Sequence, residues 1–530
     1  MDHSFTFEFP YRSQRMPVLA RNCVATSQPL AAQAGLRMLL AGGNAVDAAL
    51  ASAIALTVVE PTSNGIGSDL FAIVWDGHAL HGLNASGRSP AGWARERFAK
   101  YAGQMPVVGW DTVTVPGAVS GWIELHAKLG KLPLERIFEP AIHYAREGYL
   151  VSPITARAWG FAQVMFDGFD DWRDTFTLGG RAPRAGERFA SEAHAATLES
   201  ICATRGESIY RGELAQRICA AANEAGAALC AKDLASHRAD WVGTISTDYR
   251  GLRVHEIPPN GQGVAALSAL AILREMNLRD LAVDSADSLH LQIESMKLAL
   301  ADVYAQVSDP RFMRIDPNDM LDPAYAKSRA GQIDPKHAKQ FSTGFPPREG
   351  GTVYMTAADE SGMMVSLIQS NYYGFGSGIV IPGTGIAMQN RGFGFTLEKN
   401  HPNEVGPSKR PFHTIIPGFV TRGGKPLVSF GVMGGAMQAQ GHVQMITRIF
   451  VYDQNPQAAS DAPRWQVMGG LKVILEEGTS ADVVDDLQSR GHQIRVAPPK
   501  EFGGAQLIYR LDDGYVVASD SRKDGQAVGF

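Results

Sequence analysis

The sequence predicts a mixed α+β fold, and three observations support this class. The chain has 530 residues, of which 45% are hydrophobic and 19% are charged, so it can bury a large core. Helical patterns with capping signals occur in the early and middle parts of the chain. Beyond residue 351 the pattern changes to pairs of short strands separated by turns of Gly and polar residues.

The early chain predicts two consecutive helices. Ser27 is a suitable N-cap for the first helix, and Gly42-Gly43 ends it. Asn44 is a suitable N-cap for the second helix, with Asp47 three residues later as a variant of the capping box. The second helix, residues 45–58, is rich in Ala on nearly every side, so we expect it to be buried between layers.

The rest of the chain predicts a hairpin, a long helix and then two further hairpins. Residues 310–351 are rich in Pro, Gly and polar residues, and we expect loop with short helical pieces there. Their end, at Gly350-Gly351, divides the chain into portions of residues 1–351 and 352–530. The expected elements are a hairpin over 70–83, a helix over 285–303, strand pairs 352–358 with 363–370 and 415–420 with 427–430, and a helix over 437–452.

Charge and composition exclude several classes of function. Lys and Arg total 49 and Asp and Glu total 54, so a net charge of -5 gives no electrostatic case for nucleic acid or an anionic membrane. The longest apolar stretch, residues 48–59, is too short to span a bilayer. The N-terminal residues show no export signal, and we therefore expect a cytoplasmic protein.

General motif searches find no familiar catalytic or metal-binding pattern. The sequence contains no nucleophile elbow, no Walker A loop and no His-Glu-x-x-His. The four cysteines form no C-x-x-C pair, and the 14 histidines are scattered. We expect neither a metal nor a cofactor.

One candidate nucleophile remains at the start of a predicted strand. A Thr hydroxyl needs an adjacent base, and cleavage of the bond before Thr352 would supply the new α-amine of the same residue. The pKa of a free α-amine, about 7.7–8.0, leaves part of it neutral near pH 7. Taken alone, Gly351-Thr352 is weak evidence for a nucleophile, because a strand that begins after a glycine turn explains it better.

A second candidate feature is a glycine pair between a predicted strand and a predicted helix. Gly434-Gly435 allows consecutive N–H groups to face one point, and the helix N-terminus adds positive potential. This arrangement suits an oxyanion. A tight strand-to-helix turn is the alternative interpretation.

Eight stretches form an ordered set along the chain: Ala41-Gly-Gly-Asn-Ala-Val-Asp-Ala-Ala49, residues 59–67, 115–117 and 140–148, Gly351-Thr352 with its hairpin, residues 375–378, residues 406–411 and Gly434-Gly435. In this order they resemble the γ-glutamyltranspeptidase family of N-terminal nucleophile hydrolases. Within that family the resemblance is greatest to its transpeptidase-like and cephalosporin-acylase-like branch.

The resemblance implies a four-layer αββα sandwich and self-cleavage between Gly351 and Thr352. It implies that Thr352 is the nucleophile and that Gly434 and Gly435 form the oxyanion hole. Ser370 falls where the family has a Thr that hydrogen-bonds the nucleophile. The two fragments would stay associated, and the partners would be a small-molecule acyl amide and a water or amine acceptor. Whether copies of the chain associate is left open.

The positions that bind substrate depart from those of true transpeptidases. The family's groups that hold the substrate α-amine fall on Gly394, Arg391 and Tyr372, with Asn390 beside them. Gly carries no charge, and Arg has the wrong sign to bind an ammonium. We therefore expect an acyl group that carries a carboxylate or polar tail but no α-ammonium.

The carboxylate-binding positions are also altered. The family's paired serines fall on His413 and Thr414, and its Arg position is Ser86, with Arg88 two residues later. Residues 395–409 leave little room for a lid loop.

Three functions follow as hypotheses. The first is an N-terminal threonine hydrolase or acyltransferase that cleaves γ-glutamyl-like or other acyl amides. The second is a genuine γ-glutamyltransferase that acts on glutathione. The third is a non-catalytic or unprocessed homologue that binds a small acid.

Overall fold

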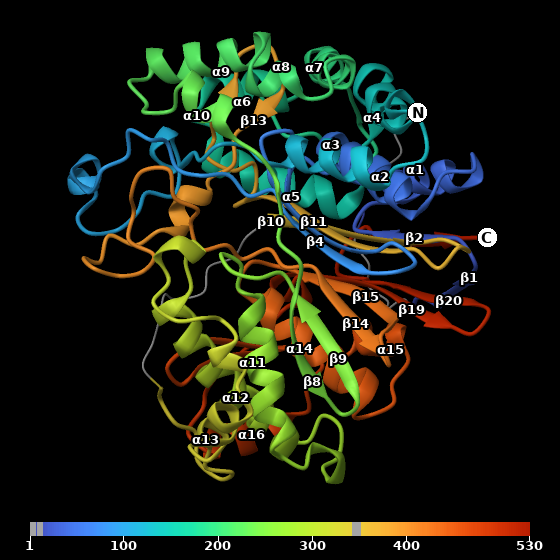
Figure 1. Cartoon of the computed structure of the whole chain (residues 1–530), viewed down its shortest axis with the longest axis vertical. Helices are drawn as coiled ribbons and strands as arrows, with labels where there is room; N and C mark the ends of the chain where they lie inside the picture. The colour runs from blue at the N-terminus through green and yellow to red at the C-terminus, as the bar shows by residue number, and fades with distance from the viewer. Residues whose placement is uncertain (1–6, 8–13, 342–350) are drawn as a thin grey trace.

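The computed structural model describes residue 7 and residues 14–341 and 351–530, and its frame is a pair of seven-stranded sheets (Figure 1). In spatial order, the first sheet contains β21 (Gln526–Gly529), β2 (Cys23–Thr26), β10 (Gly351–Ala358), β11 (Met364–Tyr372), β3 (Asp69–Trp75), β4 (Leu80–Asn84) and β7 (Asp240–Trp241). The second contains β1 (Val18–Ala20), β20 (Gly514–Ser519), β19 (Gly504–Leu511), β15 (Lys425–Met433), β14 (Gly418–Arg422), β9 (Leu252–Glu256) and β8 (Ile245–Tyr249).

The inner faces of the two sheets share one apolar layer. Tyr354 of β10 and Phe71 of β3 meet Phe419 of β14 and Ile508 of β19 there. Successive residues of a strand point to opposite faces, so the intervening Val353 and Met355 belong to the core beneath the outer helices. β10 is therefore buried on both faces.

Helices cover the outer face of each sheet (Figure 1). Those that pack on the first sheet include α1 (Pro29–Leu40), α2 (Ala45–Val59) and α3 (Ala118–Leu129), and α4 (Leu134–Glu147) packs on α2. Those that pack on the second include α11 (Gly263–Arg274) and α14 (Met437–Phe450), and α12 (Ala286–Gln306) packs on α11. Among the described residues, no helix is long and apolar enough to cross a membrane.

The remaining helices and strands lie at the ends of these layers. The helices are α5 (Pro153–Phe166), α6 (Asp170–Phe176), α7 (Glu192–Ala203), α8 (Glu207–Tyr210), α9 (Glu213–Glu224), α10 (Ala231–Ser236), α13 (Pro323–Ala330), α15 (Pro456–Asp461) and α16 (Ala481–Ser489). The strands are β5 (Tyr149–Leu150) with β6 (Arg188–Phe189), β12 (Val380–Ile381) with β13 (Ile386–Ala387), and β16 (Trp465–Gly469), β17 (Lys472–Glu476) and β18 (Gln493–Ala497).

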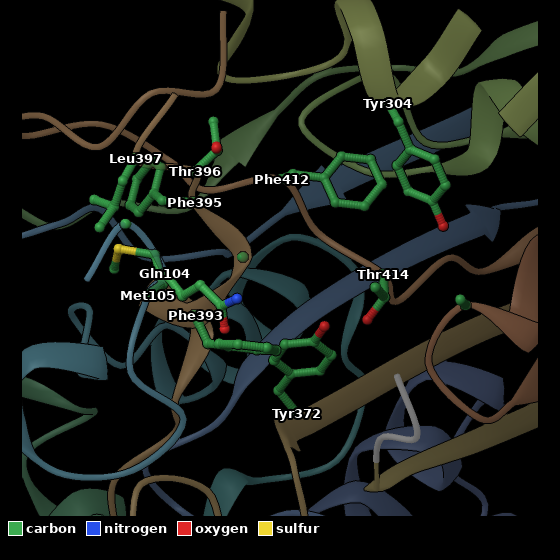
Figure 2. A pocket seen from close by; sticks show the side chains of 13 residues that line it. Gln104, Met105, Tyr304, Tyr372, Phe393, Phe395, Thr396, Leu397, Phe412 and Thr414 are labelled. Carbon is green, nitrogen blue, oxygen red and sulfur yellow. The ribbon is translucent and has the colours of Figure 1, made fainter. Parts of the chain in front are cut away.

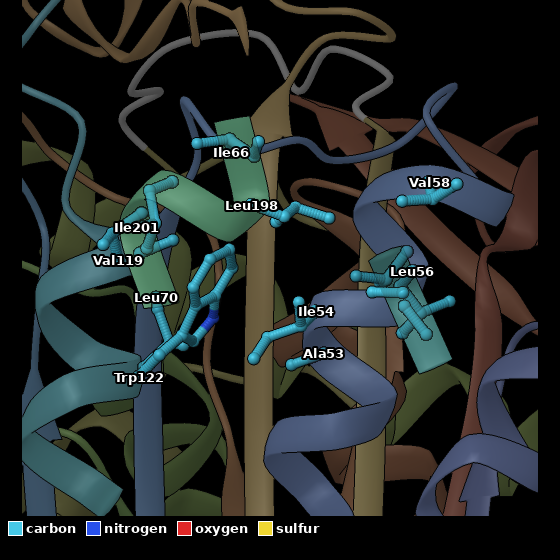
Figure 3. Packing of buried hydrophobic residues seen from close by; sticks show 14 of the residues in the cluster. Ala53, Ile54, Leu56, Val58, Ile66, Leu70, Val119, Trp122, Leu198 and Ile201 are labelled. Carbon is cyan, nitrogen blue, oxygen red and sulfur yellow. The ribbon is translucent and has the colours of Figure 1, made fainter. Parts of the chain in front are cut away.

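The expectation that the second helix is buried is confirmed. Every residue of α2 is buried, and Figure 3 shows its Ile54 and Leu56 among side chains that include Leu70 and Trp122. Small Ala side chains let neighbouring layers approach α2 on several sides. The capping box of Asn44 and Asp47 is also present.

The first helix begins differently from the expectation. Gln28, not Ser27, is the N-cap, and its side-chain oxygen accepts hydrogen bonds from the Leu30 and Ala31 N–H groups. The Ser27 hydroxyl instead donates to the Glu60 carboxylate at 2.5 Å. A long-range partner therefore takes the side chain that the local pattern assigned to capping.

The α+β class and most predicted elements are confirmed, and the second late hairpin is shifted. β14 starts at Gly418 rather than Ile415, because the Ile415 and Ile416 N–H groups donate to the His413 and Gln438 side chains. β15 continues to Met433, because it pairs with β19 as far as that residue. The sequence analysis did not predict this pairing. The turn before α14 is correspondingly short.

The helix cap at Asp47 provides a stability test. Its buried carboxylate accepts hydrogen bonds from the N–H groups of Asn44, Lys131 and Leu132 at 2.9–3.0 Å. Asp47→Ala should lower the free energy of unfolding by about 2–3 kcal/mol, because these donors lose a charged acceptor. Asp482→Ala, at an exposed acid in the first turn of α16, should change it by less than about 0.5 kcal/mol. Equal losses in thermal unfolding would contradict the assignment.

Candidate active site

Thr352 is the second residue of β10, an inner strand of the first sheet. Its side chain is 1% exposed, and its hydroxyl donates to the Ser370 hydroxyl of β11 at 3.3 Å. The β10–β11 register shifts between Gly351 and Val353. This irregularity falls at the residue that the sequence predicts as the nucleophile.

Ser370 connects the Thr352 hydroxyl with the carbonyl group that precedes it. The Ser370 hydroxyl donates to the Gly351 carbonyl oxygen at 2.6 Å. The Ser370 hydroxyl oxygen itself accepts hydrogen bonds from the Tyr372 N–H at 2.7 Å and from the Thr352 hydroxyl. The structure therefore joins the predicted nucleophile, its predicted hydroxyl partner and the predicted scissile carbonyl in one hydrogen-bonded group.

The glycine pair forms the turn between β15 and α14. Gly434 and Gly435 have φ angles of 118° and 58°, which favour glycine. In the part of the chain that the structure describes, neither N–H group donates to a protein acceptor. The loop is joined to the nucleophile through Gln438, whose side-chain N–H lies 3.4 Å from the Thr352 hydroxyl oxygen. These features suit an oxyanion hole.

Arg391 is a buried cation that contacts Tyr372 and Thr414. It is 1% exposed, donates to the Thr414 hydroxyl at 2.9 Å and lies 4.4 Å from the centre of the Tyr372 ring. Its Nε and Nη2 atoms have no acceptor among the described residues. The guanidinium thus holds Thr414 through a hydrogen bond and Tyr372 through a cation–π contact.

A buried carboxylate balances this cation. Burial raises the pKa of Asp69 to about 7, although Arg391 opposes that shift. Burial also lowers the pKa of Arg391 to about 10, and Asp69 opposes that change. His413 lies 3.1 Å from Asp69, and burial holds its pKa well below the ordinary value, so it is a neutral hydrogen-bond donor to Asp69. Sequence analysis missed Asp69.

A cavity of about 220 Å³ opens beside Thr414, Tyr372 and Ala436, the residue that follows the glycine pair (Figure 2). Its other described lining residues are Gly103, Gln104, Met105, Tyr304, Phe393, Gly394, Phe395, Thr396, Leu397 and Phe412. Aromatic and apolar side chains dominate this lining. None of the described lining residues is charged.

The other predicted substrate-binding residues do not line this cavity. Arg88 pairs with Asp309 at 2.8 Å within a group of ion pairs. Asn390 is buried and bonds to the backbone of Val107 and Tyr373. His413 is held against Asp69. Of the predicted set, Tyr372 and Thr414 face the cavity, Arg391 supports them, and Gly394 contributes backbone.

One group of potential metal ligands lies away from this site, and a lysine already occupies it. The ligand atoms of His290, Glu294 and His492 lie within 4.8 Å of one another. The Lys297 ammonium lies 2.7 Å from Glu294 and 3.3 Å from His492. His290 and His492 are 2.8 Å apart and share a hydrogen bond. These donors already satisfy one another, so the geometry gives no reason to assign a metal ion.

The family model described as gamma-glutamyltranspeptidase matches residues 31–530. The chain belongs to the γ-glutamyltranspeptidase family. It is similar to the crystal structure of a cephalosporin acylase from Bacillus halodurans, with a TM-score of 0.96 and 47% identity, and 99% of each chain is covered.

Two curated relatives of this family member come from different bacteria. The glutathione hydrolase-like YwrD proenzyme of Bacillus subtilis (strain 168) is 35% identical, over 96% of this chain and 98% of the relative. The oxamate amidohydrolase proenzyme of Klebsiella pneumoniae subsp. pneumoniae is 33% identical, over 94% and 97%. The names of these relatives combine amide hydrolysis with a proenzyme form.

A substitution in the glycine turn tests whether Gly434 and Gly435 form the oxyanion hole. A Cβ at Gly434 would approach the Gly503 Cα to 3.1 Å in a backbone conformation that L residues rarely adopt. Gly434→Ala should therefore reduce kcat by about 10²–10³, because the turn must rotate its N–H groups. Gly423→Ala, in an open turn of the same portion, also has a positive φ and serves as the matched control. Unchanged kcat in folded Gly434→Ala would contradict the assignment.

Proposed function

We propose that this enzyme, an amide hydrolase or acyltransferase of the γ-glutamyltranspeptidase family, cleaves itself before Thr352 and then uses Thr352 as its N-terminal nucleophile. The observation that carries the proposal is the contact of Ser370 with both the Thr352 hydroxyl and the Gly351 carbonyl oxygen. The layered helices and sheets would then be the αββα sandwich of N-terminal nucleophile hydrolases. The mature fragments would be residues 1–351 and 352–530.

The hydrogen bonds around Ser370 suit the self-cleavage step. The Thr352 oxygen attacks the Gly351 carbonyl carbon, and the Ser370 hydroxyl donates to the oxygen that becomes negative. The C–N bond then breaks, the nitrogen of Thr352 takes the proton of the hydroxyl, and an ester remains. Water hydrolyses this ester, which gives the Gly351 carboxylate and a free α-amine on Thr352.

The same hydroxyl then serves turnover. The free amine accepts the proton of the Thr352 hydroxyl as the oxygen attacks a substrate amide. The Gly434 and Gly435 N–H groups donate to the oxyanion. The leaving amine takes the proton, and water or a second amine resolves the acyl-enzyme. The presence of Thr352, of a hydroxyl at Ser370 and of the Gly434-Gly435 pair argues against a non-catalytic homologue.

Strand order supports continued association of the fragments. β10 of the C-terminal portion lies between β2 of the N-terminal portion and β11, and β11 in turn pairs with β3. In the second sheet, β14 pairs with β9 across the same division. Separation would break several ladders and expose both cores, so cleavage should leave one folded particle.

The cavity supports an acyl donor without an α-ammonium. Its described lining carries no acid to pair with an ammonium, and the Arg391 cation lies directly behind Thr414 and Tyr372. Positive potential from this side favours a carboxylate or other polar tail, and the aromatic lining favours a substrate with apolar surface. We do not expect direct contacts between the substrate and Arg88, Asn390 or His413, because none of the three lines the cavity.

Replacement of the nucleophile tests the proposed processing. Thr352→Ala should give a single intact chain without amidase activity, because no hydroxyl remains to attack. Thr352→Ser should retain part of both activities. Denaturing gels and an anilide assay measure the two outcomes. Normal cleavage of Thr352→Ala would exclude this mechanism of maturation.

Substrate choice can be measured with two amides of one leaving group. The glutaryl amide should have a higher kcat/KM than the γ-glutamyl amide, because only the latter brings an ammonium near Arg391. Arg391→Met should reduce the difference while Arg253→Met, at an exposed arginine, leaves it unchanged. A strong γ-glutamyl preference in the wild type would instead favour a genuine γ-glutamyltransferase.

A further inference from the structure

Gln438 contacts the candidate nucleophile from the second sheet's side of the site. It lies in the first turn of α14 and is fully buried. Its side-chain N–H donates to the Thr352 hydroxyl oxygen at 3.4 Å. No local motif distinguishes this glutamine from Gln440 or Gln444 on the same helix.

The orientation of the Gln438 amide follows from its other partner. The Ile416 backbone N–H lies 3.0 Å from the Gln438 side-chain oxygen. A backbone N–H only donates, so the oxygen of the amide must face Ile416 and its NH₂ group must face Thr352. The Thr352 oxygen is therefore an acceptor toward Gln438, and its hydrogen must point elsewhere.

The direction left for the Thr352 hydrogen is the productive one. The Ser370 hydroxyl oxygen lies 3.3 Å from the Thr352 hydroxyl oxygen, and it donates its own hydrogen to the Gly351 carbonyl oxygen. The order of donors is thus Gln438 to Thr352, Thr352 to Ser370, and Ser370 to the Gly351 carbonyl. Reversal of the first bond would turn the Thr352 hydrogen away from Ser370.

We propose that Gln438 is a positioning residue that sets the direction of the Thr352 hydroxyl hydrogen. During maturation it directs the hydrogen to Ser370, and after cleavage it keeps the hydrogen on the side of the new α-amine. Its donated hydrogen bond also stabilises negative charge that develops on the Thr352 oxygen. This role rests on the proposed function, since it requires Thr352 to be the nucleophile.

A second buried glutamine, Gln262, connects the glycine turn with Thr414 of the cavity lining. The Gln262 side-chain N–H donates to the carbonyl oxygens of Thr414 at 2.6 Å and Gly435 at 2.9 Å. Thr414 lies two residues before Ile416, which holds Gln438. The cavity wall, the glycine turn and the nucleophile are therefore joined through two buried amides.

The test uses two substitutions of Gln438. Gln438→Glu keeps the shape but replaces the NH₂ donor with a carboxylate oxygen, which accepts the Thr352 hydrogen and turns it from Ser370. Gln438→Met removes the amide and keeps similar volume. Each should slow self-cleavage about tenfold or more, and should reduce kcat per cleaved molecule by a similar factor with KM unchanged.

Gln444→Met is the matched control. Gln444 is buried on α14 and exchanges two hydrogen bonds with the Trp465 backbone at 2.9 and 3.2 Å, away from Thr352. It should lower Tm about as much as Gln438→Met does, while self-cleavage and kcat stay within twofold of the wild type.

The outcomes separate this inference from the proposed function. If Thr352→Ala is cleaved normally, the proposed function fails and Gln438 loses this role with it. If Thr352→Ala stays intact while both Gln438 variants match the wild type in cleavage and kcat, only the role of Gln438 is overturned. Equal loss of kcat in Gln438→Met and Gln444→Met would also overturn it, because a general packing effect would then explain both.

Discussion

The hydrogen bond from Ser370 to the Gly351 carbonyl is the contact on which the rest of the site depends. It lies at the register shift between two central strands, where the ladder places a hydroxyl opposite the predicted scissile carbonyl. Both strands are buried on both faces, so packing leaves this pair little freedom to move. The predicted scissile bond and the Ser370 hydroxyl thus lie on two neighbouring central strands of the first sheet.

A second constraint is the charge buried behind the cavity. Arg391 and Asp69 lie in the interior, where burial raises the pKa of Asp69 and lowers that of Arg391, while the attraction between the two groups opposes both shifts. The Arg391 guanidinium contacts Tyr372 and Thr414, and the Asp69 carboxylate, which His413 hydrogen-bonds, partly offsets its charge. We propose that the guanidinium beneath this uncharged wall disfavours a substrate ammonium without a direct ion pair.

Local signals predicted the elements, and long-range contacts decided the details. Asn44 with Asp47 and the hairpin after Gly351 follow from neighbouring residues, and the structure has both. Ser27 fails as a cap because it binds Glu60, a partner 33 residues away. Gln438 meets Thr352 across 86 residues, and nothing in its local sequence marks it. The family resemblance therefore predicted Thr352 as the nucleophile, while the contacts of Arg391 and Gln438 became visible only in the structure.

The most direct test of the account is to find where an acyl group resides during turnover. The purified enzyme would be mixed with an activated glutaryl ester, quenched in acid and mapped by tandem mass spectrometry. The glutaryl group is expected on the hydroxyl of Thr352, in a peptide whose first residue is Thr352. An acyl group on another side chain, or an active enzyme in which Gly351 and Thr352 are still joined, would contradict it.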